Sequence, residues 1–212
     1  MNDTIKKLGQ IGIVPVVVFN DVEEALPLAA CLMEGGLSCA EVTFRTVAAE
    51  GSIRRMVKAF PDMLVGAGTV LTCEQAQRAI DAGAKFIVSP GFNPKVTEYV
   101  LDKGVSMTPG VCTPTEIEAA MQFGLDVLKF FPAETSGGLK MIEAMAAPYG
   151  GLKFMPTGGI NADNVREYLK HDRIVACGGS WMVKAGLMKE GKFEEIKRLV
   201  REAASIVKAI RG

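Results

Sequence analysis

The 212-residue sequence lacks an excess of charge of either sign, and it lacks long hydrophobic runs. Lys and Arg number 24, and so do Asp and Glu, which makes the formal net charge zero. Nucleic-acid-binding proteins normally carry a basic excess or stripe, so we expect no nucleic-acid partner. No uninterrupted apolar stretch approaches about 18 residues, so we expect no transmembrane helix. Because 49% of the residues are hydrophobic and 23% are charged, intrinsic disorder is also excluded.

Histidine is almost absent, since His171 is the only one. This excludes metal sites that are built from several histidines. A serine triad would have to use His171, and no supporting motif surrounds it. His171 follows the end of a predicted helix, where a cationic side chain is favourable, so we expect no catalytic role for it.

Cysteine is present in an odd number and without any Cys-x-x-Cys spacing, which indicates reduced thiols and a cytoplasmic protein. The stretch Leu28-Ala29-Ala30-Cys31 looks like a lipoprotein cleavage site. Acidic residues at positions 21, 23 and 24 interrupt the apolar region that a signal peptide requires. We therefore expect no signal peptide, and we expect Cys31 to be a core residue of an amphipathic helix.

Short apolar runs recur along the chain, and several are rich in Val and Ile. They predict buried parallel strands. The eight runs are Ile13–Phe19, Cys39–Phe44, Met63–Ala67, Phe86–Ser89, Val105–Thr108, Val127–Phe131, Leu152–Pro156 and Ile174–Cys177.

Helical stretches lie between these runs, and several have a capping residue at the start and a glycine after the end. Those named are Asp21–Glu34, Thr72–Ala82, Thr113–Phe123 and Asn161–Lys170, with an additional N-terminal helix at about 2–10 and a long final helix at Lys192–Ile210.

Eight strands that alternate with helices predict an α/β fold, a single (β/α)8 TIM barrel. The N-terminal helix would precede a barrel of about 11–212, and residues 1–212 would form a single domain. The alternative is an open doubly wound sheet, which usually has a phosphate-binding loop after its first strand. The stretch Val18-Phe19-Asn20-Asp21 is not such a loop.

Lys129 lies inside an apolar predicted strand, where an ammonium group without a partner is costly. The alternation of a strand puts Val127, Lys129 and Phe131 on one face. It also puts Glu41 and Thr43 on one face, together with Arg45 if that strand extends so far. One interpretation is a buried Lys–Glu ion pair that only fills the barrel.

The functional interpretation is an amine nucleophile. A nucleophilic lysine must lose its proton, which burial and a nearby cation such as Arg45 favour. Lys129 would then form an imine with a carbonyl substrate, and Glu41 would transfer protons. Arg45 could bind a substrate carboxylate in bidentate fashion, and Thr69 could either bind the same carboxylate or cap the next helix.

Glycine-rich segments follow the last two predicted strands, as Gly158-Gly159 and Gly178-Gly179-Ser180. In many barrels these two loops bind phosphate through backbone N–H groups. A single Gly-Gly is more often a turn, but two pairs at these strand ends predict a phosphate site.

Seven motifs occur in order along the chain. They are Glu41-Val42-Thr43-x-Arg45-Thr46, Gly66-Ala67-Gly68-Thr69-Val70, Ser89-Pro90-Gly91, Pro109-Gly110, Lys129-Phe130-Phe131-Pro132-Ala133-Glu134, Pro156-Thr157-Gly158-Gly159-Ile160 and Gly178-Gly179-Ser180-Trp181. Together they resemble the class I aldolases that act on 2-keto-3-deoxy-6-phosphogluconate and 4-hydroxy-2-oxoglutarate. The likeness extends from about residue 11 to about residue 205.

This resemblance implies a barrel, a homotrimer, a small-molecule 2-keto acid substrate and no metal or organic cofactor. It implies that Lys129 forms the Schiff base and that Glu41 is the proton shuttle. The remaining implied site residues are Arg45 and Thr69 for the carboxylate, Gly158, Gly159 and Ser180 for the phosphate, and Thr157, Phe131 and Pro90 as further candidates.

Two other functions stay open at this point. One is a phosphosugar isomerase-type barrel that shares only the phosphate loops and needs no imine. The other is a non-catalytic phosphate-binding or scaffold barrel. A chain without catalysis should lose the charged residues at its strand ends, and this one retains Lys129, Glu41 and Arg45.

Overall fold

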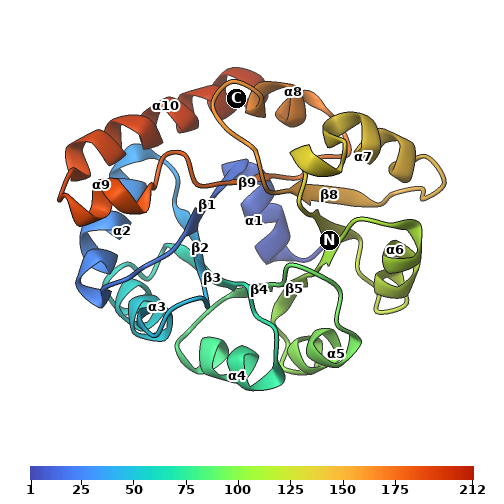
Figure 1. Ribbon diagram of the computed structural model, residues 1–212, viewed down its shortest axis with the longest axis horizontal. Helices are drawn as coiled ribbons and strands as arrows, with labels where there is room; N and C mark the ends of the chain where they lie inside the picture. The colour runs from blue at the N-terminus through green and yellow to red at the C-terminus, as the bar shows by residue number, and fades with distance from the viewer.

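The computed structural model describes all 212 residues and has an α/β fold, in which helices surround curled layers of parallel strands (Figure 1). The strands are β1 (Ile13–Val17), β2 (Cys39–Thr43), β3 (Leu64–Gly68), β4 (Phe86–Val88), β5 (Ser106–Thr108), β6 (Gly110–Val111), β7 (Val127–Phe130), β8 (Lys153–Pro156) and β9 (Cys177–Gly179).

The α-helices are α1 (Asp3–Ile11), α2 (Ala25–Gly35), α3 (Ala48–Ala59), α4 (Cys73–Asp81), α5 (Pro94–Asp102), α6 (Pro114–Met121), α7 (Gly138–Ala146), α8 (Val165–Lys170), α9 (Ala185–Lys189) and α10 (Phe193–Arg211). Two short 3-10 helices, η1 (Val22–Glu24) and η2 (Glu134–Ser136), precede α2 and α7. None of these helices combines the length and the apolar character needed to cross a membrane.

The strands form two sheets, and every strand pair is parallel. One sheet has the order β5-β4-β3-β2-β1-β9, and the other has the order β6-β7-β8. Pro109 alone separates β5 from β6. Isolated parallel bridges join Phe154 to Ile174 and Thr157 to Gly178, so β8 lies beside the segment that contains β9.

The predicted starts of two helices are confirmed by their capping contacts. The Thr72 side chain accepts a hydrogen bond from the Gln75 N–H at the start of α4. At the start of α6, Thr113 and Glu116 form a reciprocal capping box, and Pro114 occupies the first helical turn. These contacts satisfy N–H groups that have no partner inside the helix.

Two predicted helices begin later than expected. The segment Asp21–Glu34 starts as the 3-10 helix η1, which Asp21 caps, and becomes α-helical only at Ala25. Helix α8 starts at Val165 instead of Asn161. The Asn161 side chain accepts hydrogen bonds from the N–H groups of Asp163 and Asn164, and this local turn replaces the first helical turn.

The last predicted strand, Ile174–Cys177, is displaced along the chain, because β9 comprises Cys177–Gly179. Gly178 and Gly179 therefore belong to the strand and pair with Val14 and Pro15 of β1. Their lack of side chains is required there. A Cβ atom at Gly178 would overlap the Thr157 side chain, and one at Gly179 would overlap the Trp181 ring.

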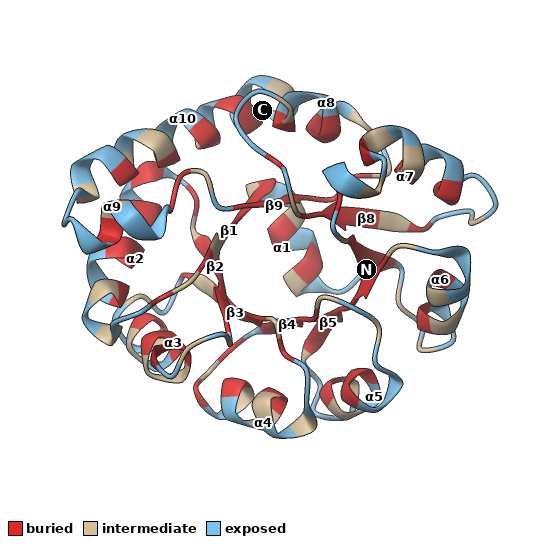
Figure 2. Cartoon of the chain, in the orientation of Figure 1, coloured by how far each residue is buried: buried red, intermediate tan, exposed pale blue.

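Buried residues follow the strands and the inward faces of the helices (Figure 2). A separate apolar cluster contains Ile5 and Leu8 of α1 together with residues at or near the starts of strands, such as Cys39, Phe86 and Val127. Helix α1 thus covers the amino ends of the strands. The carboxyl ends stay free for a site.

Candidate active site

Lys129 and Glu41 form a buried ion pair, although they come from β7 and β2, which are not neighbours in a sheet. The Lys129 Nζ lies 3.4 Å from the Glu41 Oε1, and the two residues are 5% and 1% exposed. The other carboxylate oxygen of Glu41, Oε2, is buried and has no hydrogen-bond partner in the protein. Such an unsatisfied acceptor is costly, so it indicates a group that is kept for chemistry.

Glycine makes room for the carboxylate. A Cβ atom at Gly68, the last residue of β3, would overlap the Glu41 side chain. Glu41 lies opposite Gly66 in the β2–β3 register, and a Cβ atom there would overlap the ring of Phe86. The two glycines of β3 thus leave space for two different buried side chains.

An aromatic ring borders the lysine. The Lys129 Nζ lies 5.1 Å from the centre of the Phe131 ring, as expected from the predicted alternation along this strand. Pro90 follows β4, and its carbonyl occupies the space that a Cβ atom at Gly110 would need. Gly110 is in turn opposite Lys129 in the β6–β7 register. Phe131 and Pro90 therefore both lie close to the β7 strand end.

Arg45 and Thr69 meet at the ends of β2 and β3. The Arg45 Nε donates a hydrogen bond to the Thr69 Oγ1 at 3.3 Å. The strand does not extend to Arg45, which was the condition for placing Arg45 on the face of Glu41 and Thr43: β2 ends at Thr43, and Arg45 is an exposed residue of the following turn. Thr69 has a φ of 56°, which is strained for a β-branched residue. Backbone strain of this kind is often found at functional sites.

The predicted phosphate-binding loop Gly158-Gly159, called the anion loop below, joins β8 to α8. Gly158 and Gly159 have φ values of 99° and 81°, in the left-handed region that favours glycine. The N–H groups of Gly159 and Ile160 donate no hydrogen bond within the protein, whereas the bridge between Thr157 and Gly178 directs the Gly158 N–H toward the Gly178 carbonyl. Ser180, an exposed residue, directly follows β9 on the neighbouring segment.

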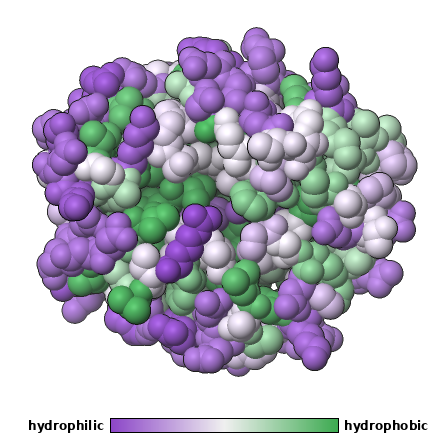
Figure 3. All heavy atoms as spheres, in the orientation of Figure 1, coloured by the Kyte–Doolittle hydropathy of each residue, from purple (hydrophilic) through white to green (hydrophobic).

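A pocket of about 190 Å³ brings together Arg45, Phe131, Thr157, the two loop glycines and Ser180. The other predicted site residues do not line it, namely Lys129, Glu41, Thr69 and Pro90. The Thr157 Oγ1 is buried without a hydrogen-bond partner, like the Glu41 Oε2. The pocket wall also contains residues that the sequence did not single out as site residues, namely Val16, Val18, Ile160, Gly178 and Gly179. Strand alternation puts Val16 and Val18 on one face, but did not show which face. In space-filling view, hydrophobic residues gather around the middle of one face of the molecule (Figure 3).

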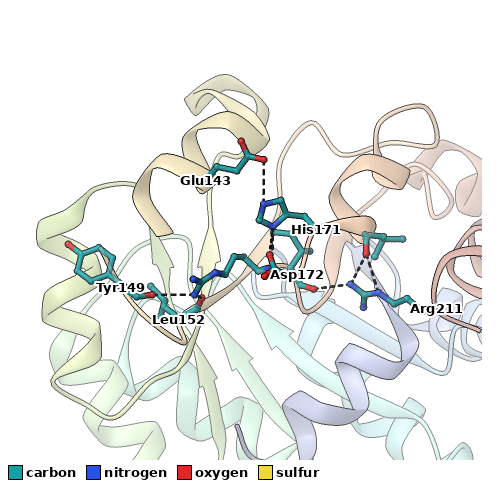
Figure 4. A network of polar contacts seen from close by, with 9 residues as sticks. Glu143, Tyr149, Leu152, His171, Asp172 and Arg211 are labelled. Atoms are coloured by element: carbon teal, nitrogen blue, oxygen red, sulfur yellow. Dashed lines mark hydrogen bonds and ion pairs between the residues drawn. The ribbon is translucent and has the colours of Figure 1, made fainter. Parts of the chain in front are cut away.

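A larger hollow of about 700 Å³ lies between α1, α8 and α10, at the amino ends of β8 and β9. Three of the polar residues that line it, His171, Asp172 and Arg211, make polar contacts within the protein (Figure 4). His171 lies 3.4 Å from Glu143 and 3.3 Å from Asp172, and the Arg211 guanidinium donates to backbone carbonyls. Burial lowers the pKa of Arg211. None of the predicted site residues lines this hollow, so we place the candidate site at the opposite end.

The comparisons with known proteins agree on one family. The family model for KDPG and KHG aldolase matches residues 4–199. A 2-dehydro-3-deoxy-phosphogluconate aldolase of Treponema pallidum is 50% identical over 94% of this chain and 95% of its own length. A KHG/KDPG aldolase of Escherichia coli strain K12 is 40% identical over 90% of each chain.

Among solved structures, a KDPG aldolase of Legionella pneumophila superposes with a TM-score of 0.90 at 35% identity. The match covers 93% of this chain and 96% of that one. That crystal structure contains pyruvate captured as a covalent carbinolamine intermediate.

Proposed function

The chain belongs to the KDPG and KHG aldolase family, and from this premise we propose how its pocket works as a class I aldolase site. The reaction is the cleavage of 2-dehydro-3-deoxy-6-phosphogluconate to pyruvate and D-glyceraldehyde 3-phosphate through an imine on Lys129. 4-Hydroxy-2-oxoglutarate has the same pyruvyl end, and its cleavage would give pyruvate and glyoxylate. The observation that carries the proposal is the buried Lys129–Glu41 pair, with Nζ and Oε1 3.4 Å apart.

The first half of the reaction forms the imine. Lys129 loses a proton, for which the Glu41 carboxylate is the nearest acceptor. The neutral amine then attacks the C2 carbonyl, and Glu41 returns its proton to the carbinolamine hydroxyl, which leaves as water. A protonated imine remains, and Glu41 is again a carboxylate. The positive nitrogen is an electron sink for the next step.

The second half breaks the C3–C4 bond. Glu41 takes the proton of the C4 hydroxyl, the aldehyde leaves, and the bonding electrons pass into the imine to give an enamine. Protonation at C3 and hydrolysis then release pyruvate and regenerate Lys129. The unpartnered Oε2 of Glu41 supports this assignment, because it leaves an acceptor available for the hydroxyl.

The substrate ends are assigned to the two polar edges of the pocket. Arg45, with its contact to Thr69, would hold the carboxylate next to the reacting carbonyl. The Gly158–Gly159 loop, through the free N–H group of Gly159, would hold the phosphate together with the Ser180 hydroxyl. Thr157 and Phe131 line the space between these edges.

Borohydride trapping tests the imine. The protein is incubated with pyruvate, reduced with borohydride and digested, and the modified peptide is identified by mass spectrometry. An adduct on Lys129 is expected. An adduct on another lysine would move the active site, whereas no adduct on folded protein would favour a non-covalent phosphate-binding barrel.

For the fold, we propose that residues 11–212 form a closed (β/α)8 barrel in a single domain, with α1 as an additional N-terminal helix. In this barrel, β5 and β6 would be two parts of one strand that is interrupted at Pro109. The bridges from Phe154 and Thr157 to the β9 segment would close the ring between β8 and β9.

For the assembly, we propose a homotrimer in the cytoplasm. Exposed apolar side chains support contacts between copies, notably Val47 at 97% and Leu71 at 50% exposure, after β2 and β3. Five free cysteines fit a reducing compartment. Sedimentation equilibrium measures the assembly, and a mass of one chain would exclude the trimer.

A further inference from the structure

Tyr168 and Glu134 are joined behind the anion loop, and the reaction described above uses neither of them. Tyr168 lies on α8 and is 3% exposed, and its hydroxyl donates a hydrogen bond to the Glu134 Oε1 in η2. Burial and the contact with Glu134 raise the pKa of Tyr168 well above its usual value. The hydroxyl therefore stays protonated and remains a donor.

Glu134 and the turn that precedes α8 hold both carbonyl groups of the loop. The Gly158 carbonyl accepts a hydrogen bond from the Glu134 N–H at 3.0 Å. The Gly159 carbonyl accepts one from the Asn164 Nδ2 at 3.0 Å and one from the Asn161 Nδ2 at 3.3 Å. These hydrogen bonds fix the orientation of both peptide groups, and the Gly159 N–H, which donates no hydrogen bond within the protein, is left free for a ligand.

The hydrogen bond of Tyr168 connects these two anchors. Asn164 immediately precedes α8, and Tyr168 lies one turn further along that helix. Glu134, which holds the Gly158 carbonyl through its N–H, accepts from Tyr168 through its side chain. The contacts thus form a closed ring through η2, the loop and α8.

Close packing fixes the Glu134 side chain within this ring. A Cβ atom at Gly159 would lie 2.6 Å from both the Cβ and the Cγ of Glu134. A Cβ atom at Gly138 would lie 3.1 Å from the Tyr168 hydroxyl and 3.2 Å from the Glu134 Oε1. A shift of Glu134 would therefore displace the Gly158–Gly159 loop.

We propose that Tyr168 is a positioning residue that sets the preference for phosphorylated substrates, acting through Glu134 on the Gly158–Gly159 loop. This inference rests on the proposed function of the loop. The imine chemistry at Lys129 does not involve the ring of contacts. Loss of the Tyr168 hydroxyl should therefore weaken recognition of the distal phosphate more than it affects cleavage itself.

The test compares two substrates in Tyr168→Phe. The ratio of kcat/KM for 2-dehydro-3-deoxy-6-phosphogluconate to that for 4-hydroxy-2-oxoglutarate should fall by about five- to tenfold, mainly through KM of the phosphorylated substrate. Tyr149→Phe is the matched control. It removes a similar hydrogen bond, from Tyr149 to Glu118 at 3.0 Å, far from the loop, and should leave the ratio unchanged.

Two variants of Glu134 separate positioning from a general loss of stability. Glu134→Gln keeps an oxygen acceptor for Tyr168 and should restore most of the ratio, whereas Glu134→Ala should lower it as Tyr168→Phe does. Equal losses for both substrates, or no change in the ratio, would overturn the inference.

Borohydride trapping with pyruvate is run on the wild type and on each variant. An adduct in all of them, without a change in the substrate ratio, refutes the role of Tyr168 alone. The absence of an adduct in the wild type refutes the proposed function and this inference with it.

Discussion

Lys129 and Glu41 lie in a part of the protein where charges are expensive. Removing a lysine and a carboxylate from water costs several kcal/mol for each ion, and their attraction seldom returns more than that. A pair of hydrophobic residues would fill the same space at similar or lower free energy. The pair is therefore better explained by the amine chemistry than by stability.

Lys129→Ala should reduce cleavage by at least about 10³-fold, because no other amine lies beside Glu41 to form the imine. Lys140→Ala, which changes an exposed lysine of α7, is the control and should keep normal activity. The measurement is kcat/KM in a coupled assay for pyruvate, with circular dichroism to establish folding. Substantial activity in folded Lys129→Ala would contradict the mechanism.

Glu41→Gln separates proton transfer from imine formation. The amide has nearly the same shape but cannot accept the C4 hydroxyl proton, so cleavage should slow by about 10²- to 10⁴-fold. Pyruvate should still be trapped on Lys129 by borohydride, given enough time. Normal turnover in this variant would show that another group moves the proton.

At the scale of single residues, charge in an apolar context was informative in the sequence. Lys129 and Glu41 could be predicted because a charged residue in a buried strand needs a reason. Val16 and Val18 carried no such signal, since a valine on a strand looks the same on either face. Nothing in the sequence indicated a role for Tyr168 either, because an aromatic residue on a short helix usually contributes only to packing.

At the scale of elements, β3 shows how one strand serves both stability and chemistry. Gly66 leaves space for the ring of Phe86, and Gly68 leaves space for the carboxylate of Glu41. The two positions are two residues apart and therefore share a face. Moving along the strand by that distance changes the neighbour from the core side chain of Phe86 to the proposed catalytic side chain of Glu41.

An added methyl group should therefore have different effects at these two positions. Gly66→Ala should lower the free energy of unfolding by about 1–3 kcal/mol through overpacking, with near-normal kcat in the folded protein. Gly68→Ala should reduce kcat because it displaces Glu41. Gly186→Ala, where the new Cβ meets nothing within 4 Å, is the control. A normal kcat in Gly68→Ala would mean that Glu41 moves without consequence.

The boundaries of elements were less predictable than their order. The order of strands and helices follows from apolar runs and caps, and the structure has it. The predicted start of α8 at Asn161 was wrong because an asparagine side chain can replace a helical turn, as that of Asn161 does. The predicted position of the last strand was wrong because Gly178 and Gly179 are not apolar residues of the kind that mark a buried strand, although β9 requires their small size.

At the scale of the whole molecule, burial should control the reactivity of the five thiols. Cys73 and Cys112 are half-buried, whereas Cys31, Cys39 and Cys177 are buried. Burial raises the pKa of Cys177 to about 12 and also raises that of Cys39. Because these thiols stay protonated up to high pH, they are poor nucleophiles in the folded protein.

Titration with Ellman's reagent at pH 8 should therefore show two fast thiols and three slow ones, all five becoming fast in denaturant. Raising the pH from 8 to 10 should not make Cys177 fast, since that range lies below its raised pKa. Mass spectrometry of the labelled peptides identifies the fast pair. Fast labelling of Cys39 or Cys177 in native buffer would show that the strands open more readily than their burial implies.

The amino ends of the strands pack against α1 and contribute to stability, whereas the proposed chemistry takes place toward their carboxyl ends. Helix α1 buries Leu8, which is 1% exposed, against the amino ends of the strands, while every candidate site residue lies toward the other end.

Leu8→Ala should therefore lower the free energy of unfolding by about 2–5 kcal/mol, the usual cost of a cavity in a packed core. Thermal and urea denaturation measure this change. Well below the melting temperature, kcat/KM should stay within about twofold of the wild type, since no residue of α1 lines the pocket. Leu26→Ala, at a leucine that is 37% exposed, should cost much less stability. A large loss of activity in folded Leu8→Ala would show that the two ends are coupled through the interior.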